Sequence, residues 1–391
     1  MSVDLKVNFC EISFKNPIIV PAGVHGRDGE TIREISKTGV AAICTKTIVS
    51  QPATDVLPCF YSVGAGMLNS VFGSDKSSEY WFTQGIKEAK EGESLVIANV
   101  AGFTPEESAE LALKAEKAGA DMIVLPTCCP HMGEILNAMF EGLSFPEPKL
   151  TDLKPMKKSV KLMKESLKIP VVVKLSGTFS HIAREWALGV EEAGADGIAC
   201  SDALGPALSI DIRTGQPVLG GPRGVGGLTG PAIMPITLRM VLDAALATDL
   251  PIIGIGGVTT AEDVVEYLMA GSTLVGVCTA GHKEGPGRYA KIIRDLEKLM
   301  ADLGYENPLQ ARALTIRRIQ ERKEKKLTAV TDPVIPEIVE DDCNSCGRCV
   351  KVCAYDAVRI PEKAVIDPYK CIGCGLCVSV CPTRAMIQMY Y

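Results

Sequence analysis

The sequence predicts an α/β protein, a (β/α)8 TIM barrel followed by a small cysteine-rich domain. Three observations support this fold class. Short β-branched runs alternate with amphipathic stretches from residue 17 to about 303. Glycines close many of these runs and stretches. Residues 336–391 instead contain two regularly spaced groups of cysteine.

Eight runs read as buried strands. In chain order they are PIIVPAG, AAICTKT, LVIANVAG, MIVLPTCC, PVVVKLS, GIACSDA, PIIGIGG and LVGVCTA. They are apolar on both faces, as in a parallel sheet covered by helices. The intervening helices include GETIREISKTG, PEESAELALKAEKAG, HIAREWALGVEEAG and TAEDVVEYLMAG, each ending at a glycine suited to a left-handed C-cap. A closed barrel is favoured over an open doubly wound sheet, because the strand-end glycines suit a site built from many loops around one mouth.

The segments outside this alternation predict the domain limits. VNFCEISFKN, before the first strand, reads as a two-strand cap over the barrel floor. ARALTIRRIQERKEKK is mostly basic around three apolar residues and reads as a solvated helix, with packing on the barrel or docking of an acidic partner as alternatives. LTAVTDPVIPEI reads as a linker. We therefore expect a barrel over 1–305, a basic helix and linker over 306–335, and a cysteine-rich domain over 336–391.

The composition is that of a globular enzyme. The net charge is -6, and no apolar run reaches the roughly 20 residues that a bilayer span requires. We expect neither membrane insertion nor nucleic-acid binding, since the chain has no basic excess. Fifteen cysteines, and a start without a basic stretch followed by an apolar one, predict a reducing, cytoplasmic location.

The C-terminal cysteines predict iron-sulfur ligands. Their spacing, C-x-x-C-x-x-C-x-x-x-C in each group, is that of a bacterial two-cluster ferredoxin, in which the fourth cysteine of each group ligates the other cluster. This resemblance implies two [4Fe-4S] clusters in a ferredoxin-like domain and a function in electron transfer. One cluster would be held by Cys343, Cys346, Cys349 and Cys381, and the other by Cys371, Cys374, Cys377 and Cys353. Zinc sites and disulfides are the alternatives, and both fit the spacing or the compartment less well.

Two glycine-rich strand ends predict a phosphate site. They are GIGGV at 254–258 and VCTAG at 277–281, after the seventh and eighth strands. In this fold those loops, with a helix N-terminus, commonly bind phosphate. No G-x-G-x-x-G unit opens an N-terminal βαβ segment, so no dedicated dinucleotide site is expected. The phosphate is therefore assigned to FMN.

Two lysines at strand ends, Lys46 and Lys174, predict an anionic partner. A buried lysine is costly unless it is paired with an anion or an electron-rich ring. The isoalloxazine ring of FMN would provide that partner, with Lys174 near N1 and the C2 oxygen and Lys46 toward the ribityl chain. The alternative is a lysine whose head reaches into the solvated loops.

The fourth strand ends in Thr127-Cys128-Cys129-Pro130-His131-Met132. At most one of the adjacent cysteines can point back into the core, so the other is expected to face the mouth or the loop. A thiol with a pKa near 8.5 is a plausible proton donor or acceptor at carbon. A small buried hydrophobic residue is the alternative interpretation.

These segments resemble the flavin half of dihydropyrimidine dehydrogenase and, more distantly, class 1 dihydroorotate dehydrogenases. The matching segments are TKT at 45–47, LN at 68–69 with SDKSSEYW, CCPH at 128–131, VKL at 173–175 and GGLTGPAI at 226–233, besides the ferredoxin-like domain. The resemblance implies hydride exchange between FMN and an activated C=C bond, with Cys129 as the catalytic proton donor. It places at the cofactor Ala22, Gly23, Lys46, Thr47, Asn99, Lys174, Asp202, Gly227, Thr229, Gly230, Gly256, Gly257, Cys278 and Thr279.

The expected substrate contacts are Asn69, Thr104, Pro126, His131, Asp202 and Ala203. The pyrimidine-binding asparagines of the family fall at Pro126, Thr104 and Asp202, and each lost hydrogen bond costs on the order of 1 to 3 kcal/mol. We therefore predict a small unsaturated carbonyl substrate other than uracil. A true dihydropyrimidine dehydrogenase acting on uracil or thymine, and an electron-relay subunit without an organic substrate, are the alternatives.

The resemblance also implies partners. In bacterial two-subunit pyrimidine enzymes, a separate FAD protein oxidises NAD(P)H and passes electrons through clusters to the barrel. We therefore expect an FAD and NAD(P)H protein or a ferredoxin as redox partner, and a homodimer or hetero-oligomer.

Overall fold

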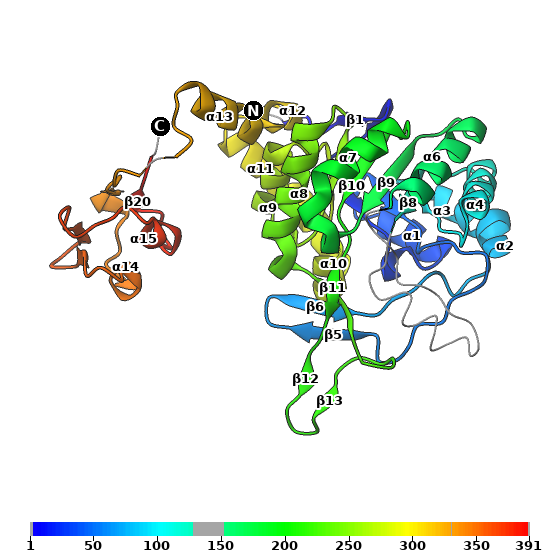
Figure 1. Ribbon diagram of the computed structural model, residues 1–391, viewed down its shortest axis with the longest axis horizontal. Coiled ribbons are helices and arrows are strands. Elements are labelled where there is room, and N and C mark those ends of the chain that lie inside the picture. Colours follow the sequence, from blue (N-terminus) through cyan, green and yellow to red (C-terminus); the bar gives the residue numbers. More distant parts are fainter. Residues whose placement is uncertain (1–2, 128–151, 330, 390–391) are drawn as a thin grey trace. The chain divides into compact units, whose positions relative to one another are not determined.

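The computed structural model describes residues 3–127, 152–329 and 331–389 (Figure 1). The chain divides into two compact units, Met1–Ile316 and Arg317–Tyr391. The predicted basic helix and linker, residues 306–335, fall on both sides of this division. None of the helices among the described residues combines the length and the apolar character that a membrane crossing requires.

Eight parallel strands close into a barrel in the first unit. They are β3 (Ile18–Val20), β4 (Ala42–Cys44), β7 (Leu95–Asn99), β8 (Met122–Pro126), β9 (Val171–Leu175), β10 (Gly197–Cys200), β15 (Ile252–Ile255) and β16 (Leu274–Gly276). Each strand pairs with the next in this order, and β16 closes the barrel by pairing with β3. All eight predicted strands and the closed barrel are confirmed.

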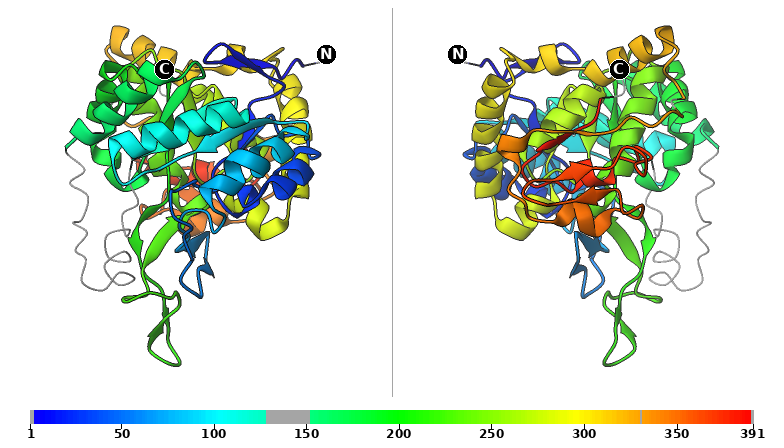
Figure 2. Two further views of the ribbon diagram at one scale, coloured as in Figure 1. Left: turned by 90° about the vertical axis from the view of Figure 1, so that its right-hand side faces the viewer. Right: turned by 90° about the vertical axis from the view of Figure 1, so that its left-hand side faces the viewer.

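Helices surround the barrel (Figure 2). The longer ones are α1 (Gly29–Ser36), α4 (Pro105–Ala118), α6 (Lys154–Ser166), α7 (Ala183–Glu192), α8 (Met234–Ala247), α9 (Ala261–Ala270) and α11 (Gly287–Asp302). Shorter ones are α2 (Ser78–Tyr80), η2 (Trp81–Gly85), α3 (Ile86–Lys90), α10 (Thr279–Glu284) and α12 (Pro308–Ala311). The glycines predicted to close α1, α4, α7 and α9 all have positive φ angles. The predicted basic helix is α13 (Leu314–Glu324), and none of its residues is buried.

Alternation along the strands creates two apolar layers. In β3, for example, Ile19 faces the barrel interior, while Ile18 and Val20 pack under the helices. A hairpin of β1 (Val7–Phe9) and β2 (Ile12–Phe14) adds Phe9 and Phe14 to the interior layer, with their rings edge to face at 6.2 Å. The predicted two-strand cap is therefore present, and it fills the floor with aromatic rings.

A second sheet covers part of the barrel. Its order is β11 (Leu204–Ala207), β14 (Gly226–Thr229), β6 (Gly66–Asn69) and β5 (Phe60–Val63), all antiparallel. Figure 1 shows the hairpin of β12 (Ile210–Asp211) and β13 (Gln216–Pro217) extending beyond it. These strands come from the chain after β4 and after β10, so two distant insertions meet over one end of the barrel.

The second unit holds two short antiparallel pairs. β17 (Glu337–Ile338) pairs with β20 (Met386–Ile387), and β18 (Val358–Arg359) pairs with β19 (Val365–Ile366). Two short helices, α14 (Arg348–Val352) and α15 (Leu376–Ser379), each contain a cysteine of one group. The buried residues of this unit are Cys349, Val358, Ala364, Cys377 and Met386. This arrangement agrees with the predicted ferredoxin-like domain.

Candidate active site and iron-sulfur ligands

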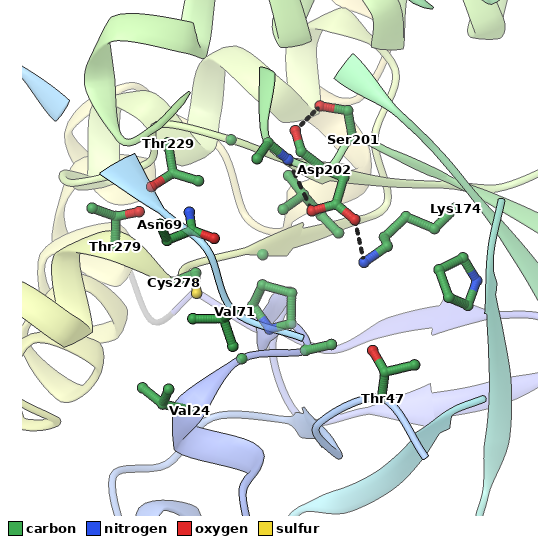
Figure 3. A pocket seen from close by; sticks show the side chains of 18 of the residues that line it. Val24, Thr47, Asn69, Val71, Lys174, Ser201, Asp202, Thr229, Cys278 and Thr279 are labelled. Atoms are coloured by element: carbon green, nitrogen blue, oxygen red, sulfur yellow. Dashed lines mark hydrogen bonds and ion pairs between the residues drawn. The ribbon is translucent and has the colours of Figure 1, made fainter. Parts of the chain in front are cut away.

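A cavity of about 400 Å³ lies at the carboxyl ends of the barrel strands. Residues at or after the end of each of the eight strands contribute to its wall, and Phe60 and Asn69 of the covering sheet also line it. Figure 3 shows Asn69 at the cavity. This is the end of a (β/α)8 barrel at which catalytic residues are found.

Most of the residues predicted at the cofactor line this cavity. They are Ala22, Gly23, Lys46, Thr47, Lys174, Asp202, Thr229, Gly230, Gly256, Gly257, Cys278 and Thr279. Asn99 instead lies behind Thr47 and donates from Nδ2 to Thr47 Oγ1 at 2.6 Å. Gly227 pairs with Asn69 in the covering sheet, where its carbonyl accepts from Asn69 Nδ2 at 3.3 Å.

The residues predicted to contact the substrate divide into three groups. Asn69, Pro126, Asp202 and Ala203 line the cavity. Thr104 does not, because it is the N-cap of α4 and its side chain accepts from the amide of Glu107. The proposed catalytic Cys129, its neighbour Cys128 and His131 lie outside the described residues.

Both strand-end lysines are buried and each has a carboxylate partner. Lys174 Nζ lies 2.8 Å from Asp202 Oδ2, as Figure 3 shows, and Lys46 Nζ lies 2.9 Å from Asp55 Oδ2. The Lys174 side chain is 10% exposed while that of Asp202 is 40% exposed. The sequence predicted the bound cofactor as the anionic partner of each lysine. The protein itself supplies carboxylates, so burial of the two lysines does not by itself require a bound anion.

Asp55 was not found from the sequence. It lies in a segment without helical or strand periodicity between β4 and β5, and it accepts from Lys46 and from the amide of Phe72 at 2.7 Å. The only available signal was an acidic residue shortly after a strand-end lysine, which is too common to identify an ion pair.

The paired glycines after β15 form a backbone cradle. The carbonyl of Gly256 accepts from Tyr267 Oη at 2.7 Å and from Thr237 Oγ1 at 3.4 Å. The carbonyl and the N–H of one trans peptide point in opposite directions, so the N–H of Gly257 points away from the helices that carry those hydroxyls. Gly257 has a φ of +80°, and a Cβ there would lie 2.5 Å from Met234 Cβ. Only glycine fits this close approach.

The helix N-terminus expected beside this cradle is capped in part by the protein itself. At the start of α9 the carboxylate of Asp263 accepts from the amides of Thr259 and Thr260, at 2.6 and 2.9 Å. This capping box satisfies the amides of Thr259, Thr260 and Asp263, and it does not involve those of Ala261 and Glu262, the first two residues of α9. Further candidates are the glycine amides and the start of α10, whose N-cap, Cys278, makes no side-chain cap.

These features fit FMN in size and in chemistry. The cavity volume lies within the range of small-molecule sites, and the backbone cradle excludes side chains where a phosphate would approach. The buried Oδ1 of Asn99, directly behind Thr47, has no hydrogen-bond partner among the described residues. Buried polar atoms normally have a partner, so this oxygen is consistent with a polar group bound in the neighbouring cavity.

Two histidines at the same mouth were missed from the sequence. His282 lines the cavity, and its Nε2 lies 3.7 Å from Cys278 Sγ. Its ring packs edge to face on His25 at 4.7 Å, and His25 Nδ1 lies 2.7 Å from Tyr289 Oη. Burial lowers the pKa of His282 to about 4, and it also lowers the pKa of His25. Both rings are therefore neutral at physiological pH. The spacing of Cys278 and His282, one helical turn apart, was the available signal.

In the second unit, a small cavity of about 20 Å³ brings together the predicted ligands of one cluster. Its lining includes Cys343, Cys346 and Cys349 with Cys381 from the other group. Cys381 thus lies with the first three cysteines, as crossing of the fourth cysteine requires, and the ligand sets stay a prediction. Backbone amides approach two sulfurs of the other predicted set, from Ala357 to Cys353 Sγ at 3.3 Å and from Gly373 to Cys371 Sγ at 3.4 Å. Such N–H groups stabilise thiolate ligands.

Comparison with known proteins agrees with both units. Residues 4–300 match the dihydroorotate dehydrogenase family, and residues 336–389 match the 4Fe-4S dicluster domain. The dihydroorotate dehydrogenase B (NAD(+)) catalytic subunit of Methanothermobacter thermautotrophicus is 35% identical over 304 residues, which cover 78% of this chain and 95% of that protein. The protein of the same name from Pyrococcus abyssi is 33% identical over 308 residues, covering 78% and 96%. That from Thermoplasma volcanium is 31% identical over 316 residues, covering 81% and 99%.

The match covers a larger share of each relative than of this chain. Almost the whole of each relative is matched, whereas about a fifth of this chain lies outside the match. The finer resemblance to dihydropyrimidine dehydrogenase stays a prediction, while the family match covers more than half of the chain. The chain thus belongs to the dihydroorotate dehydrogenase family of oxidoreductases, with a 4Fe-4S dicluster domain after its barrel.

Proposed function

We propose that this chain is an FMN-dependent oxidoreductase acting on a CH–CH group, with two [4Fe-4S] clusters that exchange electrons with a redox partner. The observation that carries this proposal is the cavity at the barrel mouth, which combines a backbone cradle with the Lys174–Asp202 pair in a chain that also has a dicluster domain. A binding module without chemistry would not need the second unit.

When bound, FMN supplies the hydride acceptor or donor for the carbon centre of the substrate. The amide of Gly257 and the start of α10 at Thr279 would hold its phosphate. Lys174 would lie at the ring with its charge partly balanced by Asp202. Asn99 would act through Thr47 as a positioning residue, because it does not line the cavity.

Cys129 is the proposed proton donor or acceptor at the second substrate carbon. The end of its strand is anchored, since Thr127 donates to the carbonyl of Lys174 from Oγ1 at 2.8 Å. This bond ties the segment that leads to Cys129 to the strand of the cavity lysine. A thiol supplied from this strand end would deliver a proton beside the hydride site.

Substitution of Cys129 by alanine tests this role. We expect FMN to stay bound and turnover to fall at least about a hundredfold, the usual scale for a positioned acid. Cys128→Ala is the matched control, because it removes the adjacent thiol, and its turnover should stay near that of the unmodified chain. Unchanged turnover in Cys129→Ala would show that the thiol has no part in the reaction.

The substrate is proposed to be a small unsaturated carbonyl compound. At the predicted asparagine positions, Asp202 and Pro126 line the cavity and Thr104 does not. Proline offers no hydrogen-bond donor, so a cyclic imide would lose contacts on this side. A second candidate is dihydroorotate, which is favoured by the name shared by the relatives that match this chain over nearly their whole length. Uracil or thymine, and a relay without an organic substrate, are further outcomes of the same test.

The test is anaerobic. The holoprotein is reduced, and flavin absorbance is followed after addition of uracil, thymine, orotate or a panel of enones. Rapid reoxidation by an enone alone would support the proposal. A response to orotate would assign the activity named for the relatives, and a response to uracil or thymine would assign a dihydropyrimidine dehydrogenase. No response to any of them, with rapid reoxidation by a partner protein, would leave an electron-relay subunit.

The redox partner is proposed from the dicluster domain. The relatives are named as catalytic subunits, which implies assembly with another subunit, but their matched lengths leave little room for a domain such as residues 336–391. In this chain the clusters would carry electrons between the barrel flavin and an FAD and NAD(P)H protein or a ferredoxin. Stoichiometric reduction of the flavin by such a partner, lost when the clusters are absent, is the expected result.

A further inference from the structure

The dicluster unit is a tandem repeat with closely matched backbones. Cys343 is equivalent to Cys371, and Cys353 to Cys381. Equivalent residues share the left-handed region, with φ of 58° at Ser345 and 70° at Gly373, 76° at Gly347 and 81° at Gly375, and 47° at Asp356 and 55° at Arg384. Each half also supplies one α-helix and two strands. Differences between the two sites therefore come from side chains.

Solvent access is also the same at the two ligand sets. Cys349 and Cys377 are each 8% exposed, Cys346 and Cys374 are exposed, and the remaining four cysteines are half-buried. Exposure is one of the main determinants of cluster potential. Because it is matched position by position, it does not distinguish the two clusters.

The side chains in the two ligand loops differ sharply in polarity. The first loop carries Asn344, Ser345 and Arg348 between its cysteines. The equivalent residues of the second loop are Ile372, Gly373 and Leu376, and Ile372 and Leu376 are 48% and 47% exposed. One cluster is thus bordered by a cation and polar side chains, and the other by aliphatic side chains.

Crossing of the fourth cysteines increases this asymmetry. Thr383 and Arg384 follow Cys381 in the sequence; Thr383 lines the small cavity together with Arg348, and Thr383 Oγ1 lies 3.7 Å from Cys381 Sγ. The equivalent residues Tyr355 and Asp356 follow Cys353, the fourth cysteine of the second set. At these positions the sequence has a cation, Arg384, after the first ligand set and a carboxylate, Asp356, after the second, whereas directly before each group the charges are reversed, with Asp342 at the first and Lys370 at the second. The asymmetry that the geometry carries is that of the cavity lining, where Arg348 and Thr383 border the first site.

A further cation borders the first site. Lys363 Nζ donates to the carbonyl of Cys343. Backbone N–H groups approach cysteines of both sets, from Ser345 and Ala364 to Cys343 and from Gly373 to Cys371, so these amides do not distinguish the two sites. Reduction adds one negative charge to a [4Fe-4S] cluster. Hydrogen-bond donors and cations stabilise this added charge, while apolar surroundings and a carboxylate do not.

We propose that the cluster held by Cys343, Cys346, Cys349 and Cys381 has the higher reduction potential, and that it collects the electron when the chain is partly reduced. This inference rests on the proposed pair of clusters. We expect the equilibrium constant for its reduction to be at least tenfold larger than that of the other cluster. This ratio corresponds to a difference in reduction potential of about 59 mV for one electron.

The test is a reductive titration of the holoprotein followed by electron paramagnetic resonance, after its iron has been measured. About eight irons per chain are expected for two clusters. One spin should appear before the second. About four irons would overturn the two-cluster assignment and this inference with it, whereas eight irons with coincident potentials would overturn this inference alone.

Two matched variants assign the signals. Arg384→Asn and Asp356→Asn place the same neutral residue at equivalent left-handed positions, where asparagine is tolerated. Arg384→Asn should lower the potential of the first-reduced cluster only. Asp356→Asn should raise that of the second only. Movement of the same signal by both variants, or the reverse assignment, would overturn the proposal.

Salt separates the contributions of charge and of hydrogen bonding. Exposed charges are screened at high ionic strength, so both asparagine variants should have smaller effects there. Thr383→Val removes a hydroxyl without changing charge, and it should lower the potential of the first-reduced cluster at low and high salt alike. An unchanged potential in Thr383→Val would exclude this hydroxyl as a contributor.

Discussion

The two units of this chain build their cores and their sites in opposite ways. The barrel buries aliphatic residues from all eight strands, and its cavity is lined by residues from every strand end. The dicluster unit buries few residues, and two of them, Cys349 and Cys377, are predicted ligands. Domains of this size seldom reach stability from an apolar core alone. The clusters are therefore expected to be part of the core of the second unit, whereas FMN enters a cavity that the barrel already has.

The largest effect is expected from a variant that removes a cluster from the core of the second unit. Cys377→Ser should prevent cluster assembly and unfold the second unit while the barrel stays folded. Both tryptophans of the chain, Trp81 and Trp186, lie in the barrel and are buried. Their fluorescence during urea unfolding therefore reports the barrel alone. We expect an unchanged tryptophan transition together with rapid proteolysis after residue 316.

Cys59→Ser is the control for this experiment. Cys59 is a half-buried barrel cysteine outside the cavity lining, so its replacement should leave the iron content unchanged. A second unit that resists proteolysis without iron would show that its small apolar core is sufficient. The contrast between the two units would then be wrong.

A glycine substitution tests the preformed cavity. Gly257→Val places a side chain at a φ of +80° and against Met234, so overpacking of about 1 to 3 kcal/mol adds to backbone strain. We expect FMN affinity to fall at least about a hundredfold, measured by fluorescence of released flavin. Gly119→Val is the control, because Gly119 has a φ of +106° with open space around it. Equal loss of FMN in both variants would indicate general destabilisation.

A smaller effect is expected from the charge pair in the cavity. Asp202→Asn removes the carboxylate 2.8 Å from Lys174 Nζ and thus one negative charge beside the ammonium. The equilibrium constant for reduction of the flavin should increase about tenfold, because a nearby cation favours added negative charge. Lys174→Met should move it in the opposite direction. Movement in the same direction in both variants would show that the pair acts through packing.

The same contrast explains what the sequence predicted. The ligands of the second unit are neighbours in sequence, so the spacing of Cys343 to Cys353 and of Cys371 to Cys381 is visible without a fold. The barrel strands were also predictable, because burial on both faces leaves continuous apolar runs such as VVVKL in β9. Both features depend on residues within a few positions of each other.

The details of the barrel site depend on distant residues and were predicted less well. Asp55 reaches Lys46 from an irregular segment, and Asp263 caps α9 with a carboxylate that the strand pattern does not reveal. Thr104 was predicted at the substrate because it follows β7, but the hydrogen bond that starts α4 holds its side chain. In each case a local hydrogen bond or ion pair, rather than periodicity, decides the position of the side chain.

The smallest expected effect is a pH dependence of barrel stability that arises from His282. Burial lowers its pKa from 6.5 to about 4 in the folded state. Between these values the unfolded chain binds a proton that the folded chain does not, so stability falls as pH decreases. We expect a loss on the order of 1 kcal/mol from pH 7 to pH 5, measured by urea unfolding at the tryptophans. Carboxylates also titrate at the lower end of this pH range. The informative quantity is therefore the difference in free energy of unfolding between the unmodified chain and His282→Gln at each pH. The free energy of unfolding of His282→Gln should depend less on pH. Parallel profiles would show that His282 is not the group that couples protonation to barrel stability.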